Sequence, residues 1–180
     1  MSVTAVPLRP IERRALGWLW LGLAVLALVG IGFAVFTTNR VVPSAAAFLA
    51  HNARKPGVTV TRSGLQYQVI VKGTGSRPTL HDLVAINYTG RLTDGTLFDA
   101  SALQGGAVQM PVGGVIPGFS EGLTLMPVGS KYRFWIPPEL GYGPAGAGNG
   151  IIPPNAVLDF EVELLGVAPR NAAPPMGLPQ

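Results

Sequence analysis

The segment AVLDFEVELLGV, residues 156–167, is the part of the chain that most restricts its fold. Apolar and acidic side chains alternate along it, with the period of two that is typical of a β-strand with one buried and one solvated face. Such a strand belongs to an antiparallel sheet. Leu158, Phe160, Val162 and Leu164 are expected on the buried face, and Asp159, Glu161 and Glu163 on the other.

Three further runs with β-rich composition predict partner strands for this segment. They are LQYQVIVKG at 65–73, LVAINYTGRL at 83–92 and SKYRFWIP at 130–137. Asp94-Gly95 follows the second run and is a strong hairpin-turn signal.

The segment GGVIPGFSEGLTLM, residues 113–126, is the one good helix candidate among these strands. Pro117 suits a first helical turn, and Phe119, Leu123 and Met126 recur at helical spacing. One antiparallel sheet covering one short helix is the economical α+β arrangement.

An apolar run of 22 residues without a charge, Ala15–Phe36, precedes this domain. As a helix it would be about 33 Å long, enough to cross a bilayer. Arg9, Arg13 and Arg14 precede it, so the positive-inside rule places residues 1–14 in the cytoplasm. A cleaved signal peptide is the alternative, because Ala45-Ala46-Ala47 matches an A-x-A site, but the run is long for that role.

The segments on either side of the main domain are expected to be a stalk and a tail. Residues 37–57 are interpreted as a stalk with a short helix that Ser44 caps and that ends before Lys55. Residues 169–180 are expected to be a disordered tail.

The charged and metal-binding side chains exclude several classes of function. The chain has no cysteine and two histidines, which excludes disulfides and thiolate catalysis and makes a metal site improbable. Residues 58–168 carry six basic and eight acidic side chains, so the basic excess lies beside the apolar run and not on the domain. Nucleic-acid binding therefore has little support.

Three longer stretches carry a resemblance to a known family. INYTGRLTDGTLFDAS, VIPGFSEGLTLMPVGSKYRFWIPPELGYG and GIIPPNAVLDFEVELL stand in the order and near the spacing of the FKBP family of peptidyl-prolyl cis–trans isomerases. The preceding FLAHNARKPGVTVTRSGLQYQVI resembles the approach to the domain in bacterial exported members of the macrophage-infectivity-potentiator type. The resemblance implies a domain at 58–168 with an antiparallel sheet of five or six strands wrapped around one short helix, and neither cofactor nor metal.

The resemblance also implies an active cleft between the helix and the concave sheet face. Phe119 stands where tryptophan is typical of the family, and no arginine follows FDAS to pair with Asp99. Asp99 must therefore find Tyr88, backbone amides or water as partners. The implied catalytic residues are Asp99, Tyr142, Phe119, Phe98, Tyr88 and Phe160, and the implied substrate-binding residues are Val108, Val115, Ile116, Ile151 and Ile152.

The chemistry expected of such a cleft is rotation about Xaa-Pro bonds without a covalent intermediate. A dry apolar pocket disfavours the planar, strongly dipolar amide more than the twisted one. The predicted protein is a monomer held in a bacterial inner membrane by residues 15–36, with its isomerase domain in the periplasm. Its expected ligands are proline-containing polypeptide clients and macrolide inhibitors.

Two alternatives stay open at this point. A non-enzymatic chaperone would grip proline segments in the same cleft, and a membrane-complex assembly module would act through the apolar helix. Without the resemblance, Phe98, Phe119 and Phe160 would each be interpreted as ordinary core residues.

Overall fold

The computed structural model describes residues 44–169 of the chain. The proposed cytoplasmic segment 1–14, the predicted transmembrane segment 15–36 and residues 170–180 lie outside the described residues. Between residues 44 and 169, no helix has the length and apolar character that a membrane span requires.

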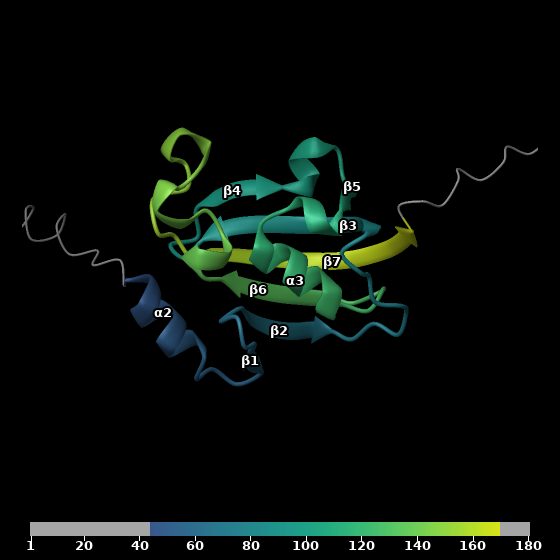
Figure 1. The fold of residues 1–180 in the computed structure, drawn as a ribbon, viewed down its shortest axis with the longest axis horizontal. Helices are drawn as coiled ribbons and strands as arrows, with labels where there is room; N and C mark the ends of the chain where they lie inside the picture. Colours follow the sequence, from purple (N-terminus) through teal and green to yellow (C-terminus); the bar gives the residue numbers. More distant parts are fainter. Residues whose placement is uncertain (1–43, 170–180) are drawn as a thin grey trace, which may run out of the picture. The chain divides into compact units, whose positions relative to one another are not determined.

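One antiparallel sheet and one short helix against it form the main body of the domain (Figure 1). The strands run in the order β1-β2-β6-β7-β3-β4, and β5 also pairs with β3. The elements are α2 (Ala45–Asn52), β1 (Val58–Val60), β2 (Gln66–Val71), β3 (Asp82–Leu92), β4 (Leu97–Ala100), β5 (Val108–Pro111), α3 (Pro117–Leu125), β6 (Lys131–Ile136) and β7 (Leu158–Pro169). Five short 3-10 turns complete them: η1 (Ser101–Gln104), η2 (Val112–Gly114), η3 (Pro138–Leu140), η4 (Gly143–Ala145) and η5 (Gly148–Gly150).

The sheet has seven strands, whereas the family resemblance implied five or six. The difference lies at the edge of β3 that does not face β7. β5 pairs there with residues 83–86 of β3, and β4 pairs with residues 89–91. The 3-10 turn η1 separates β4 from β5, so one edge position is filled by two short strands.

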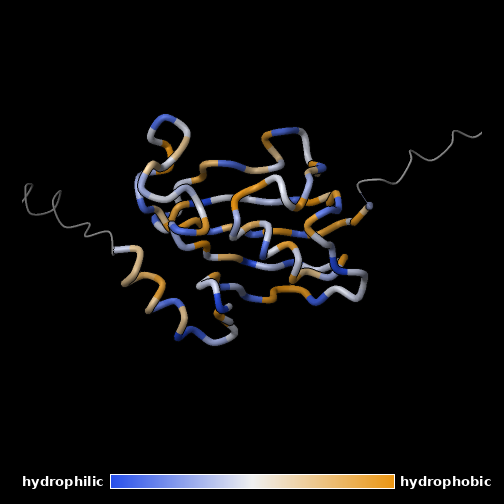
Figure 2. Tube along the Cα trace, in the orientation of Figure 1, coloured by the Kyte–Doolittle hydropathy of each residue, from blue (hydrophilic) through white to orange (hydrophobic). Residues whose placement is uncertain are grey.

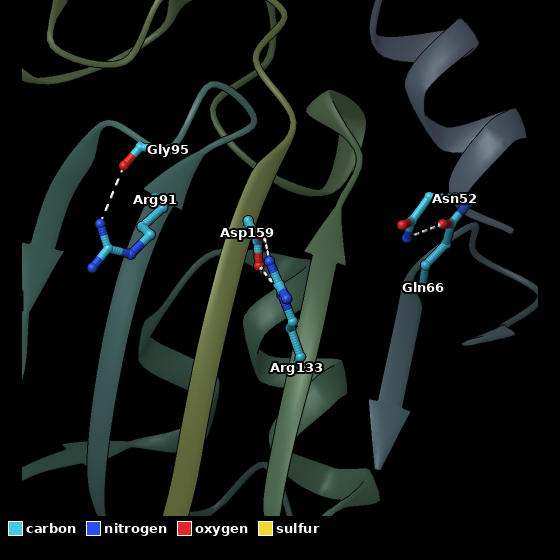
Figure 3. A network of polar contacts seen from close by, with 6 residues as sticks. All are labelled: Asn52, Gln66, Arg91, Gly95, Arg133 and Asp159. Atoms are coloured by element: carbon cyan, nitrogen blue, oxygen red, sulfur yellow. Dashed lines mark hydrogen bonds and ion pairs between the residues drawn. The ribbon is translucent and has the colours of Figure 1, made fainter. Parts of the chain in front are cut away.

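The predicted alternation along β7 is confirmed, and it can be followed in the hydropathy colouring of Figure 2. Leu158, Phe160, Val162 and Leu164 are all buried. On the opposite face, Arg133 donates to both carboxylate oxygens of Asp159 at 2.8 and 2.6 Å (Figure 3). Lys131 pairs with Glu161 on the same face. The outer face of the sheet therefore carries paired charges.

The hairpin predicted at Asp94-Gly95 joins β3 to β4. Gly95 has a φ of 90°, a backbone conformation that suits glycine. The Asp94 carboxylate accepts a hydrogen bond from the Thr96 amide at 2.9 Å, which closes the turn.

The predicted helix is α3, which begins at Pro117 and ends at Leu125. Phe119 and Leu123 are buried against the sheet, and Met126 is buried directly after the helix. A Cβ atom at Gly122 would lie 2.8–2.9 Å from the ring of Phe134, so this glycine lets the helix approach the strand closely.

The capped helix expected in the stalk is α2, where Ser44 Oγ accepts from the Ala47 amide at 3.2 Å. Its C-terminal end is attached to the domain (Figure 3). Asn52 is fully buried and donates to Gln66 Oε1 at 2.9 Å, while Gln66 donates to the Leu49 carbonyl at 2.9 Å. At the other terminus β7 continues through Pro169, the first residue assigned to the predicted tail.

Candidate active site

An open cleft of about 500 Å³ is lined by residues of the sheet, of the loops beside it and of the start of α3. α3 begins directly after Ile116, which places the N-terminal end of the helix at this cleft. The lining residues are Tyr88, Asp99, Met110, Gly114, Val115, Ile116, Phe119, Tyr142 and Phe160.

Interlocked aromatic rings form the inner wall of the cleft. The ring centroids of Phe119 and Phe160 lie 4.8 Å apart, and Tyr88 lies 6.2 Å from each of them. Phe98 packs edge-on against Phe160 at 5.3 Å. Edge-to-face contacts of this kind stabilise one relative orientation of the rings, so the wall is preorganised.

Gly90 makes room for this wall from within β3. A Cβ atom at this position would lie 2.7 Å from a Phe160 ring carbon and 2.8 Å from two ring carbons of Phe98. The rings of Phe98 and Phe160 can take these positions only because Gly90 has no side chain.

The polar side of the cleft is a chain of two hydrogen bonds. Tyr88 donates its hydroxyl proton to Asp99 Oδ2 at 2.7 Å, and Gln104 donates from Nε2 to the Tyr88 hydroxyl at 3.0 Å. Burial, followed by the hydrogen bond to Asp99, raises the pKa of Tyr88 to about 12. The Tyr88 hydroxyl is therefore protonated at physiological pH, and it donates a hydrogen bond to the Asp99 carboxylate at the cleft.

Tyr142 presents the second hydroxyl of the cleft. It lies between η3 and η4 and is 40% exposed. Within the described part of the chain, no residue forms a hydrogen bond with its hydroxyl, which leaves that group able to donate to a ligand in the cleft.

Most of the residues implied by the resemblance line this one cleft, and four do not. Phe98 lies behind Phe160, and Val108 is half-buried at the edge of the core. Ile152 is buried and pairs with Ala147, whereas Ile151 is 58% exposed. None of these four positions is among the residues that line the cleft.

The sequence reasoning missed three positions at this site, namely Met110, Gly114 and Gln104. A signal existed for Met110, because it lies two residues after Val108 and therefore on the same face of β5. Gly114 and Gln104 come from 3-10 turns of three and four residues, which are too short to show a period in the sequence.

The stability of the protein at alkaline pH should depend on the ionisation of the Tyr88 hydroxyl. Because its pKa rises from 10.0 to about 12 on folding, the folded state keeps its proton where the unfolded state loses it. The free energy of unfolding should therefore fall between pH 10 and 12. Tyr88→Phe should reduce that slope in urea denaturation followed by circular dichroism, and an unchanged slope would contradict it. Burial also raises the pKa of Tyr132, so a residual slope is expected in the variant.

Within residues 44–169, no cluster of three or more His, Cys, Asp or Glu side chains could hold a metal ion. The site is instead a preorganised apolar cleft with one carboxylate and one available phenol. Together with the sheet and α3, it defines an α+β domain with an open apolar cleft.

Comparison with known proteins gives the family. Residues 75–165 match the model for FKBP-type peptidyl-prolyl cis-trans isomerase, and residues 38–69 match the domain amino terminal to it. The chain belongs to the FKBP-type peptidyl-prolyl cis-trans isomerase family.

Bacterial relatives agree with this assignment. The isomerase FkpA of Aeromonas hydrophila is 55% identical over 120 residues, which are 67% of this chain and 44% of that protein. The 22 kDa isomerase of Escherichia coli strain K12 is 54% identical over 67% of this chain and 58% of that protein. The outer membrane protein MIP of Legionella longbeachae is 46% identical over 67% of this chain and 52% of that protein. The chain thus spans about half the length of the curated relatives it matches.

Solved structures show the same fold. FkpA from Escherichia coli superimposes with a TM-score of 0.67 and 36% identity, over 87% of this chain and 71% of that one. An isomerase from Pseudomonas syringae pv. tomato gives 0.65 and 36%, over 69% of this chain and 90% of that one.

Proposed function

We propose that this chain catalyses cis–trans rotation about Xaa-Pro peptide bonds. The observation that carries the proposal is the open cleft, in which aromatic rings, one carboxylate and one available phenol face a space large enough for a prolyl segment. The family match and the bacterial relatives support the same activity.

Catalysis in this cleft rests on the difference between the planar and the twisted amide. Resonance gives the C–N bond partial double-bond character and a barrier of about 18–20 kcal/mol. A twisted amide loses that resonance and has a less dipolar carbonyl, so transfer from water to an apolar wall costs it less. A cleft that binds the twisted form more tightly lowers the barrier.

The named side chains divide this task. Phe119, Phe160 and Ile116 supply the apolar surface around the prolyl ring. Tyr142 donates to a substrate carbonyl, and Asp99 acts as a fixed charge beside the amide. An acceleration of about 10⁵-fold would require about 7 kcal/mol from these effects together.

An exchange assay tests the activity. The full-length chain in mild detergent should accelerate isomerisation of Leu-Pro and Phe-Pro peptides in two-dimensional NMR exchange spectra. Tyr142→Phe should lower kcat/KM about tenfold, because a hydrogen bond made in the transition state is lost.

Tyr67→Phe is the matched control, since Tyr67 stacks on Tyr132 outside the cleft. It should leave kcat/KM unchanged. If the wild-type chain binds these peptides without accelerating them, the enzyme proposal fails and the non-enzymatic chaperone takes its place.

The location of the domain is a further part of the proposal. We propose that residues 15–36 anchor the chain in the inner membrane, with residues 1–14 in the cytoplasm and the cleft in the periplasm. The uncharged length of the segment and the preceding Arg9, Arg13 and Arg14 support this orientation. Recovery of the chain in the soluble fraction after alkaline extraction of membranes would overturn the anchor, and N-terminal sequencing would detect cleavage near Ala45.

Two further properties of the isolated protein belong to the proposal. The cleft should take up a macrolide inhibitor in competition with proline peptides, because both would occupy the same apolar wall. The chain should be monomeric, which light scattering after size-exclusion chromatography measures.

A further inference from the structure

Gln104 is an exposed residue that does not line the cleft, and yet its side chain reaches into the polar side of the site. Its amide nitrogen Nε2 lies 3.0 Å from the Tyr88 hydroxyl. It is the last residue of η1, the 3-10 turn that follows β4.

The backbone of η1 is held in place on both sides of this residue. Ser101 is buried, and its hydroxyl accepts a hydrogen bond from the Tyr88 amide at 3.1 Å. Gly105 ends the turn with a φ of 91°, and the Gly106 amide returns to the Ser101 carbonyl at 3.1 Å. Gln104 therefore starts from a backbone position fixed relative to Tyr88.

The chemistry of the three groups determines the direction of both hydrogen bonds. An ionised carboxylate only accepts, so the single proton of Tyr88 goes to Asp99. The lone pairs of the Tyr88 oxygen then require a donor, and the Gln104 amide supplies one. Because the Tyr88 hydroxyl donates to Asp99 and accepts from Gln104, it has one preferred orientation.

Asp99 depends on this chain of hydrogen bonds for its position. Across residues 44–169, no cation forms an ion pair with it, and its side-chain hydrogen bond comes from Tyr88. Gln104 donates without adding a formal charge, so it holds the Tyr88 hydroxyl without forming an ion pair with the carboxylate.

We propose that Gln104 is a positioning residue for the isomerisation: its amide orients the Tyr88 hydroxyl and thereby places the Asp99 carboxylate beside the substrate amide. The inference rests on the proposed function. It assigns a part in turnover to an exposed glutamine that does not line the cleft.

The test compares donors and non-donors at position 104 in the full-length chain. Gln104→Met has a similar length and no donor, and it should lower kcat about fivefold while KM changes less than twofold. Gln104→Arg restores N–H donors and should recover kcat to within about twofold of wild type. The matched control is Gln109→Met on β5, an exposed glutamine outside the cleft, which should change neither constant.

A second measurement separates positioning from a general structural role. In NMR spectra of the wild type, the Gln104 side-chain amide protons should exchange with water more slowly than those of Gln109. The denaturation midpoint of Gln104→Met should equal that of wild type.

Different results would overturn the proposed isomerase activity and the positioning role of Gln104. An inactive wild-type chain removes the proposed function. An active wild type with an unchanged kcat in Gln104→Met, or a Gln104→Arg variant as slow as Gln104→Met, removes the positioning role alone.

Discussion

Gly90→Ala is expected to displace two aromatic rings at the cleft and to lower both stability and turnover. Its Cβ would lie 2.7 Å from a Phe160 ring carbon and 2.8 Å from Phe98, closer than real Cβ contacts occur. Both rings must move, and Phe160 lines the cleft. Overpacking of this kind costs about 1–3 kcal/mol of unfolding free energy. Displaced cleft walls should lower kcat/KM on the order of tenfold to a hundredfold.

Gly166→Ala is the control for this substitution. Gly166 also lies within the sheet, on β7 opposite Ala85, and nothing lies within 4 Å of a Cβ added there. Neither glycine has a positive φ, so backbone conformation does not separate the two variants. Urea denaturation and the peptide exchange assay should distinguish them. Equal stability and equal turnover would show that the rings move aside without cost.

Truncation of Phe134 should produce the largest loss of stability. This ring is fully buried on β6, lies 6.3 Å from the Phe119 ring and 6.2 Å from the Tyr132 ring, and fills the space that Gly122 leaves. Phe134→Ala removes the ring from between helix and sheet, where little can collapse into the cavity. The expected cost is about 3–5 kcal/mol of unfolding free energy.

Phe48→Ala on α2 is the matched control, because the Phe48 ring is half-buried and lies under the Lys55 ammonium. It should cost clearly less than Phe134→Ala in the same denaturation series followed by circular dichroism. A smaller loss for Phe134→Ala than for Phe48→Ala would contradict this description of the core. Since Phe119 packs on Phe134, the variant that remains folded should also bind peptide more weakly.

Much of the fold could be predicted from local patterns. The alternation of residues 156–167 indicated which side of β7 is buried, because side chains of a strand point to opposite faces in turn. Pro117 and the spacing of Phe119 and Leu123 indicated the start and the buried face of α3. Asp94-Gly95 indicated the hairpin, since a positive φ favours glycine. Each of these signals comes from neighbours in the chain.

Which of the predicted residues line the cleft could be read less well from the sequence. The resemblance predicted one cleft shared by five residues, and all five line it in the structure: Tyr88, Asp99, Phe119, Tyr142 and Phe160. It could not separate Ile152, buried beside the glycine-rich loop, from residues that line the cleft. Lining a cavity is a property of packing, and a motif match does not describe packing.

Local sequence alone determined that residues 158–164 belong to a strand with one buried face, that a short helix starts at Pro117 and that a tight turn stands at Gly95. Backbone geometry and the polarity of adjacent side chains act over a few residues, which is why these features are visible in the sequence. Only the tertiary structure decided that β4 and β5 share one edge of β3, that Gly90 leaves space for two rings, and that Gln104 reaches the Tyr88 hydroxyl. These relations join residues on different strands and turns, and the distances between them are set by strand register and side-chain packing.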